Sequence, residues 1–220
     1  MPALTDLQDQ ILRRFFDRRD DFFLTGGAAL VGFHLHHRVT HDLDLFTNAE
    51  VLDEGERTLN EIAGSLQLQI ETLRRSPDFR RFLLQGSSEG VVVDLVKDSS
   101  PQLLDKMAIG RIVIDSAREI LANKLCALLS RTEIRDLVDV ARLEEAGYSP
   151  IAALDLAARK DGAMTAGQLA WVLSSFPIPA EETLRYGMSQ KDLEDFRESL
   201  IRRLTAAAFP SKPYKGLPPC

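Results

Sequence analysis

Cysteine is scarce in this sequence, and long apolar runs are missing. The two cysteines are Cys126, which lies in an apolar pattern of helical spacing, and Cys220, the last residue. Neither belongs to a disulfide framework or to a metal-type spacing, so we expect a protein of a reducing compartment, the cytoplasm. The charged, amphipathic stretch at the N-terminus is not typical of a signal peptide. The apolar runs are too short to span a membrane.

An excess of positive charge is also missing. The formal net charge is −6, and the surplus of acidic residues lies within residues 1–115, whereas residues 116–220 are balanced. Because neither half is basic, bulk charge does not favour tight, non-specific binding to nucleic acid. A nucleic-acid substrate would therefore need a local basic patch.

The rest of the composition is that of an ordinary globular protein. The chain has 220 residues, of which 45% are hydrophobic and 27% charged, which is enough to bury a core without disulfides. Residues 1–115 mix the two kinds of apolar periodicity. Helices are predicted at 4–16, 28–36 and 54–66, and strands at 21–25, 42–46, 68–73, 79–85, 91–96 and 112–114.

The character of the chain changes after residue 115, where only helical patterns follow. Helices are predicted at 116–129, 131–146, 151–159, 165–174 and 191–208, before an irregular tail at 211–220 that holds three prolines and a glycine. We therefore predict an α+β fold: a small mixed sheet with flanking helices over 1–115, followed by a helical domain over 116–220.

Acidic residues interrupt two of the predicted strands. Asp42 and Asp44 are two apart, so the alternation of a strand places both carboxylates on one face. They repel each other unless a cation lies between them, and Mg²⁺ is a suitable oxygen-seeking ion. Asp94 follows three valines in the strand at 91–96 and is costly to bury without a partner. If the two strands are neighbours, three carboxylates meet at one metal site suited to phosphoryl chemistry. Alone, the Asp-x-Asp spacing is more often a solvated strand face.

A diglycine precedes these acids. The predicted strand at 21–25 runs into Gly26 and Gly27 and then into a helix. Glycine lets the backbone approach a phosphate closely, and the start of a helix offers unpaired N–H groups. A diglycine is usually only a turn, but the order strand, diglycine, helix, Asp-x-Asp strand joins a phosphate cradle to a metal site.

These residues resemble a known family. The segment LTGGAALVGFHLHHRVTHDLDLF, residues 24–46, is similar to the nucleotidyltransferases of the abortive-infection type IV toxin family (AbiEii/AbiGii-like), in the polymerase-β-type superfamily. The segment REILANKLCALLSRTEIRDLVDVARL, residues 118–143, resembles the family's Lys-containing helix followed by Arg-Asp-x-x-Asp. Many relatives have Thr after the diglycine, where this chain has Ala28. The fold implied is a mixed nucleotidyltransferase sheet with a C-terminal helical domain.

The resemblance implies a role for each matching residue. Asp42 and Asp44 would bind metal ions, Mg²⁺ or Mn²⁺, and Asp94 would act as a third ligand or as a base. Lys124 would neutralise phosphate charge, and Asp136 would support Lys124 or the attacking group. The resemblance also implies the residues that would contact the nucleoside triphosphate (NTP). They are Gly26, Gly27, Arg38, Thr40, Lys124 and Arg131.

Two basic features could add to this site. On one continuous helix, Lys124, Arg131 and Arg135 fall close to one line, which would face the acids across the triphosphate. The alternative is a solvated helix face with local ion pairs. A second feature is a predicted hairpin rich in arginine, which could grip an RNA backbone or could be a solvated edge protected by charge. Its members are Arg74, Arg75, Arg80 and Arg81.

The predicted function is transfer of a nucleoside monophosphate from an NTP to a tRNA or protein acceptor, by a toxin held in check by a separately encoded antitoxin. One alternative is an NTP-binding or partner-binding module of the same fold without turnover, and another is transfer to a small molecule. The pair His41-Asp42 also mimics the dyad of HD-type phosphohydrolases, but no histidine follows position 41 to complete that site.

Overall fold

A mixed sheet organises the first half of the chain. Its strands are β1 (Phe23–Thr25), β2 (Asp42–Thr47), β3 (Gln69–Ser76), β4 (Phe79–Gln85), β5 (Gly90–Lys97), β6 (Met107–Ile109) and β7 (Ile112–Ile114). They form a 7-stranded sheet in the order β3-β4-β5-β2-β1-β7-β6. β2 runs parallel to β5 and β1 parallel to β7, and the other neighbours are antiparallel. The predicted mixed sheet is therefore confirmed.

The structure is a computed structural model that describes residues 4–131 and 133–209. The predicted tail at 211–220 and Cys220 lie outside the described residues. Within the described ranges, no helix has both the length and the apolar character needed to span a membrane.

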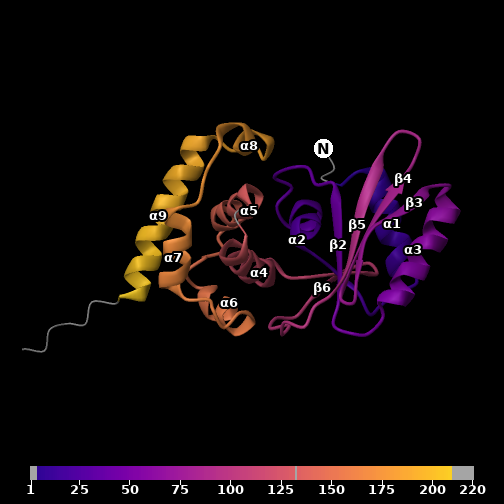
Figure 1. Cartoon of the computed structure of the whole chain (residues 1–220), viewed down its shortest axis with the longest axis horizontal. Helices are drawn as coiled ribbons and strands as arrows, with labels where there is room; N and C mark the ends of the chain where they lie inside the picture. Colours follow the sequence, from indigo (N-terminus) through magenta and orange to yellow (C-terminus); the bar gives the residue numbers. More distant parts are fainter. Residues whose placement is uncertain (1–3, 132, 210–220) are drawn as a thin grey trace, which may run out of the picture.

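Helices α1 (Asp6–Phe16) and α3 (Leu52–Leu66) cover one face of the sheet (Figure 1). Helix α1 begins with a capping box, in which the Thr5 side chain accepts from the Gln8 backbone N–H and the Gln8 side chain accepts from the Thr5 N–H. Its apolar stripe is buried, and the Phe15 ring packs edge-on against Phe22, with ring centroids 5.2 Å apart.

The opposite face of the sheet carries the short helix α2 (Gly26–Ala29), which continues as a π-helix over Leu30–His34. The prediction placed a single helix at 28–36. Instead, Gly26 adopts a φ of 63°, so β1 turns directly into the helix without an intervening loop. Helix α2 packs on β2 and on the first helix of the second half of the chain.

The second half of the chain is entirely helical in its described part. Its helices are α4 (Ala117–Ser130), α5 (Ile134–Glu145), α6 (Leu154–Lys160), α7 (Ala166–Ser174), α8 (Ala180–Arg185) and α9 (Gln190–Ala208). Figure 1 shows α4 and α5 next to the sheet half, with α7 and α9 outside them. One buried apolar cluster includes residues of both halves. Helix α8 and strand β6 were not predicted, because both are too short to show a periodicity.

The β2 strand holds its acidic and apolar residues on opposite faces. Asp42 and Asp44 are partly exposed, whereas Leu43 and Leu45 are fully buried. Alternation along the strand therefore anchors one face in the core and presents the other face to the second half of the chain.

We predict that Leu45→Ala destabilises the protein by about 2–5 kcal/mol, because it leaves a cavity under the strand that carries the acids. Urea denaturation followed by circular dichroism measures this change. Leu73→Ala is the control, because Leu73 lies on β3 with 46% of its surface exposed. Equal losses for the two variants would contradict the assignment of Leu45 to the core.

Candidate active site

Three carboxylates lie together on one face of the sheet. In the parallel pairing of β2 with β5, Asp44 is directly opposite Asp94, and Asp42 is two residues earlier on β2. Residues directly opposite each other on adjacent strands point to the same face. All three acids line one pocket with a volume of about 810 Å³. The structure thus brings together the three acids that the sequence singled out.

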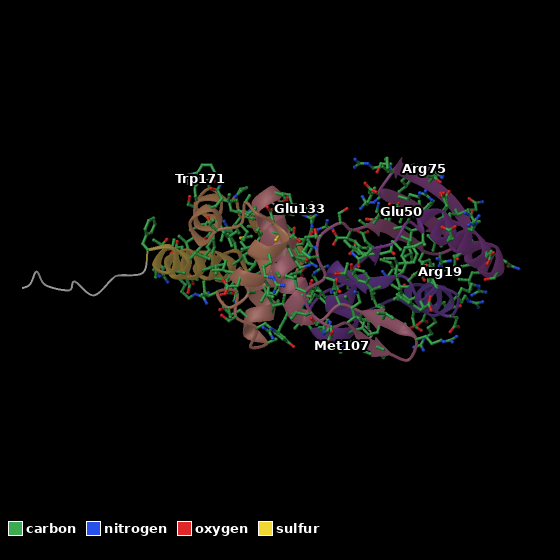
Figure 2. The ribbon with its side chains drawn as sticks, turned by 90° about the horizontal axis from the view of Figure 1, so that it is seen from below. Arg19, Glu50, Arg75, Met107, Glu133 and Trp171 are labelled. Atoms are coloured by element: carbon green, nitrogen blue, oxygen red, sulfur yellow. The ribbon has the colours of Figure 1, made fainter. Side chains whose placement is uncertain are left out.

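The pocket lies where the sheet half meets the helical half. Its lining includes the diglycine after β1 on one side and residues of α4 on the other. Glu133, another lining residue, lies at this junction in Figure 2, whereas Arg75 lies far from it on the outer side of the sheet half.

Burial and the neighbouring acids both disfavour the charged form of Asp44. Burial raises the pKa of its carboxyl to about 6, and the charge of Asp94 adds to this more than that of Asp42 does. The charges of Lys124 and Arg135 lower the pKa but do not offset the rise. A cation beside Asp44 would relieve this repulsion.

An arginine neutralises the third acid. Arg81, on β4, lies opposite Asp94 in the sheet and donates two hydrogen bonds to its carboxylate, of 2.8 and 2.6 Å. The hydrogen bond to Asp94 raises the pKa of Arg81. The sequence alone places Arg81 only in a basic hairpin, because its contact with Asp94 depends on the register of β4 with β5.

The arginines of the hairpin do not form a single patch. Arg75 and Arg80 both bind Glu56 of α3, at 2.9 and 2.7 Å, on the face of the sheet away from the pocket. Arg74 and Arg81 line the pocket and flank the ring of Phe79, at 5.5 and 5.6 Å from its centroid. Only half of the hairpin's positive charge therefore faces the acids.

The diglycine is in close contact with the acids. A Cβ at Gly26 would lie 2.3 Å from Oδ2 of Asp44, and a Cβ at Gly27 would lie 2.7 Å from Nη2 of Arg38. No larger residue fits at either position without displacing these side chains. The backbone of Gly26 therefore passes immediately beside the acidic cluster, which is the approach that a phosphate cradle needs.

Lys124 is buried in a network of charges beside the pocket. Its ammonium group is 2.7 Å from Oδ1 of Asp136 and 2.8 Å from Oδ2 of Asp139, both on α5. Burial by itself would lower the pKa of Lys124, but the charges of Asp139 and Asp136 outweigh it and raise the pKa. The predicted contact between Lys124 and Asp136 is present in the structure.

Asp139 is the centre of this network. Besides Lys124, it accepts hydrogen bonds of 2.9 and 3.1 Å from Arg38 and lies 2.9 Å from Nε2 of His37. Asp139 is the second acid of the Arg-Asp-x-x-Asp motif, and no role was predicted for it. The i, i+3 spacing from Asp136, which puts both acids on one helix face, was the signal available.

The predicted stripe of three cations on one continuous helix is wrong. Helix α4 ends at Ser130 and α5 begins at Ile134, and Arg131 between them has an extended backbone. Arg131 donates to Asp136 at 2.8 Å, whereas Nη1 of Arg135 lies 3.6 Å from Oδ2 of Asp42. The three cations surround the site from different elements because the chain breaks its helix there.

Arg38 and Thr40 are held by other parts of the chain. The guanidinium group of Arg38 is bound to Asp139 and to the backbone carbonyl of Val39, and the Thr40 carbonyl accepts from the side chain of Gln8 at 2.9 Å. Both residues line the pocket. Their contact with a nucleotide stays a prediction.

The donors fit a hard divalent cation, since Asp42, Asp44 and Asp94 offer only carboxylate oxygens at the pocket wall. Within residues 4–131 and 133–209, however, no three Asp, Glu, His or Cys side chains form a ready-made metal-ligand set. Both oxygens of Asp94 are engaged by Arg81. Asp42 and Asp44 would therefore hold such an ion first.

Residues 10–212 match the family model described as nucleotidyl transferase AbiEii toxin, type IV toxin-antitoxin system. The chain belongs to this AbiEii family. Its enzymatic activity is accordingly nucleotidyl transfer, as the resemblance implied, and the family is one of toxins. A search of curated proteins gives no match.

Solved structures share the fold. JHP933 from Helicobacter pylori is 17% identical, with a TM-score of 0.61 over 90% of this chain and 88% of that one. A second Helicobacter pylori structure is 16% identical, with a TM-score of 0.61 over 94% and 96% of the two chains. MenT4, a nucleotidyltransferase toxin from Mycobacterium tuberculosis, is 14% identical, with a TM-score of 0.50 over 94% and 82%.

We predict that Asp44→Asn stabilises the AbiEii chain by about 1–2 kcal/mol at pH 7.5 in EDTA, because it removes a carboxylate that burial and Asp94 disfavour. The folded pKa of about 6 lies above the ordinary value of 3.8, so ionised Asp44 destabilises the fold above pH 6. The advantage of the variant should shrink as the pH falls from 6 towards 4.

Urea denaturation at pH 7.5 and pH 4.5 measures the Asp44 effect. Asp105→Asn is the control, since Asp105 is exposed. A destabilised Asp44→Asn variant at pH 7.5 would show that the carboxylate is favourably bound rather than crowded.

Gly26→Ala is predicted to weaken NTP binding by at least about tenfold, because the new methyl group must displace Asp44. Gly110→Ala is a matched control: Gly110 has a φ of 61°, close to the 63° of Gly26, but nothing lies within 4 Å of its Cβ position. Both variants carry the same left-handed strain, of about 1–2 kcal/mol. Calorimetric titration with NTP measures the affinity. An equal loss of affinity in both variants would contradict the close approach of Gly26 to Asp44.

Proposed function

We propose that this chain transfers a nucleoside monophosphate from an NTP to an acceptor hydroxyl, with release of pyrophosphate, in a reaction that depends on Mg²⁺ or Mn²⁺. The observation that supports this most is the meeting of Asp42, Asp44 and Asp94 on one pocket wall, directly beside the backbone of Gly26. Repelling carboxylates are costly to keep at a site with no cation to bind.

Asp42 and Asp44 would hold the divalent ion, which supplies charge stabilisation to the phosphates when bound. Asp94 would complete the ligand set or accept the proton of the acceptor hydroxyl. The backbone of Gly26 and Gly27 would approach the triphosphate, which would lie between the sheet and α5.

Two cations support a triphosphate in this position. Arg135 already lies 3.6 Å from Asp42, with a third of its side chain exposed, so its guanidinium can turn to a phosphate. Lys124 is held by Asp136 and Asp139, so it would act as a fixed positive charge beside the site rather than as a mobile ligand. Its charge reaches Asp44, whose pKa it lowers.

An RNA acceptor is favoured over a protein by the surface next to Asp94. There the Phe79 ring and the Arg74 guanidinium offer stacking and positive charge, the two contacts that bind single-stranded nucleic acid. The overall charge of −6 would restrict such binding to this local surface. In the cell, the activity would be that of a toxin, restrained by an antitoxin partner.

An NTP-binding module without turnover is the second candidate, and calorimetry separates it from the enzyme. Binding of NTP and Mg²⁺ without any labelled product would favour that module.

The test is incubation of the protein with each NTP labelled at the α-phosphate, Mg²⁺, and either total RNA or total protein. We expect label in RNA, none from NTP labelled at the γ-phosphate, and loss of the label in EDTA. Asp42→Asn should reduce transfer by at least about 100-fold, because it removes a metal ligand itself, and even the loss of a group that only holds a ligand in place can cost about that much.

Asp105→Asn is the control variant for this assay, because it removes an exposed carboxylate of the same half of the chain. Label in protein instead of RNA would overturn the RNA acceptor only. Transfer by Asp42→Asn at the wild-type rate would overturn the proposed chemistry.

A further inference from the structure

The third carboxylate, Asp94, is already paired with an arginine of the chain, Arg81. Nε and Nη2 of Arg81 each donate to a different oxygen of Asp94, at 2.8 and 2.6 Å. This is the two-pronged geometry in which arginine binds a carboxylate most strongly. A cation of the chain itself therefore occupies the carboxylate that the proposed metal site needs.

The two partners differ in their freedom to move. The Asp94 side chain is 5% exposed and sits on a central strand of the sheet, whereas the Arg81 side chain is 40% exposed at the pocket wall. The Arg81 guanidinium also lies 5.6 Å from the centroid of the Phe79 ring, nearer the edge of the sheet. If the pair separates, Arg81 is the partner that can move away, because much more of its side chain is exposed.

A divalent ion and the Arg81 guanidinium group compete for Asp94, because their positive charges repel each other. A divalent ion between Asp44 and Asp94 would carry twice the charge of a guanidinium and would lie on the same carboxylate, so the two would repel strongly in a partly buried site.

We propose that Arg81 is a built-in counterion of the metal site, which holds Asp94 in the resting protein and must leave it before Asp94 can ligate a divalent ion. This inference rests on the proposed metal dependence. Arg81 acts as a positioning residue: it keeps a buried carboxylate neutralised without metal and lowers the affinity for metal alone.

The test is the affinity for Mn²⁺ without nucleotide, measured by the electron paramagnetic resonance of the free ion. Arg81→Met keeps an unbranched apolar stem but removes the guanidinium group and so frees Asp94. We expect it to bind Mn²⁺ about tenfold more tightly than the wild type, a change of the size that groups contacting a metal ligand typically make. In EDTA the same variant should melt at a lower temperature, because Asp94 is left buried and unpaired.

Arg74→Met is the matched control. Arg74 lines the same pocket and contacts the same ring, but it has no carboxylate partner among the ion pairs of the described residues. Its removal changes the net charge equally, so Mn²⁺ affinity should stay within about twofold of the wild type if the contact, and not the bulk charge, is responsible.

A double variant separates the ligand from its counterion. Arg81→Met combined with Asp94→Asn should lose the gain in Mn²⁺ affinity, because the freed carboxylate is gone. Arg81→Lys, which keeps the charge but cannot bind in two prongs, should give an intermediate affinity and guards against a misfolded methionine variant.

Equal Mn²⁺ affinities for the wild type, Arg81→Met and Arg81→Lys would overturn the counterion role while leaving metal dependence intact. A gain of the same size in Arg74→Met would overturn it too, as would a gain that persists in the double variant. Absence of Mn²⁺ binding in every variant, together with nucleotidyl transfer in EDTA, would overturn the proposed metal dependence and the counterion role with it.

Discussion

The parallel pairing of β2 with β5 places Asp44 directly beside Asp94, and the charges of the site are arranged around this contact. Two strands that bury Leu43, Leu45 and their neighbours on one face present acids on the other. The apolar face supplies the free energy that keeps the carboxylates together against their repulsion. The pocket is acidic because the core beneath it cannot shift its register without burying those charges.

Two kinds of cationic side chain neutralise the acids in and around the pocket. Lys124 is deeply buried between Asp136 and Asp139, and Arg38 from the segment before β2 also binds Asp139. This network links the segment before β2 to α4 and α5, so it holds the two halves of the chain in place. Arg81 and Arg135, by contrast, are partly exposed at the pocket wall, where a charged substrate can compete for them. Burial thus separates the fixed charges from those that can move.

Much of the site could be predicted because its residues lie in short segments of the sequence. The diglycine, the Asp-x-Asp strand and the strand of Asp94 each carry a local pattern of periodicity and turn residues. The link between Lys124 and Asp136 followed from the family resemblance. Arg81 could not be assigned in this way, because its contact with Asp94 depends on the register of β4 against β5. The sequence of this hairpin predicted one basic patch of four arginines. In the structure, the alternation of side chains along the strands divides these arginines between the two faces of the sheet.

The sequence by itself determined most of the strands and helices, which residues carry negative charge into the sheet, and where a glycine is required. These properties depend on neighbours within a few residues, where backbone geometry sets which side chains share a face. Only the tertiary structure decided that β2 lies next to β5 and which cation meets which acid. Ion pairs between distant segments depend on strand order and register, and these are set by the packing of the whole core rather than by any one segment.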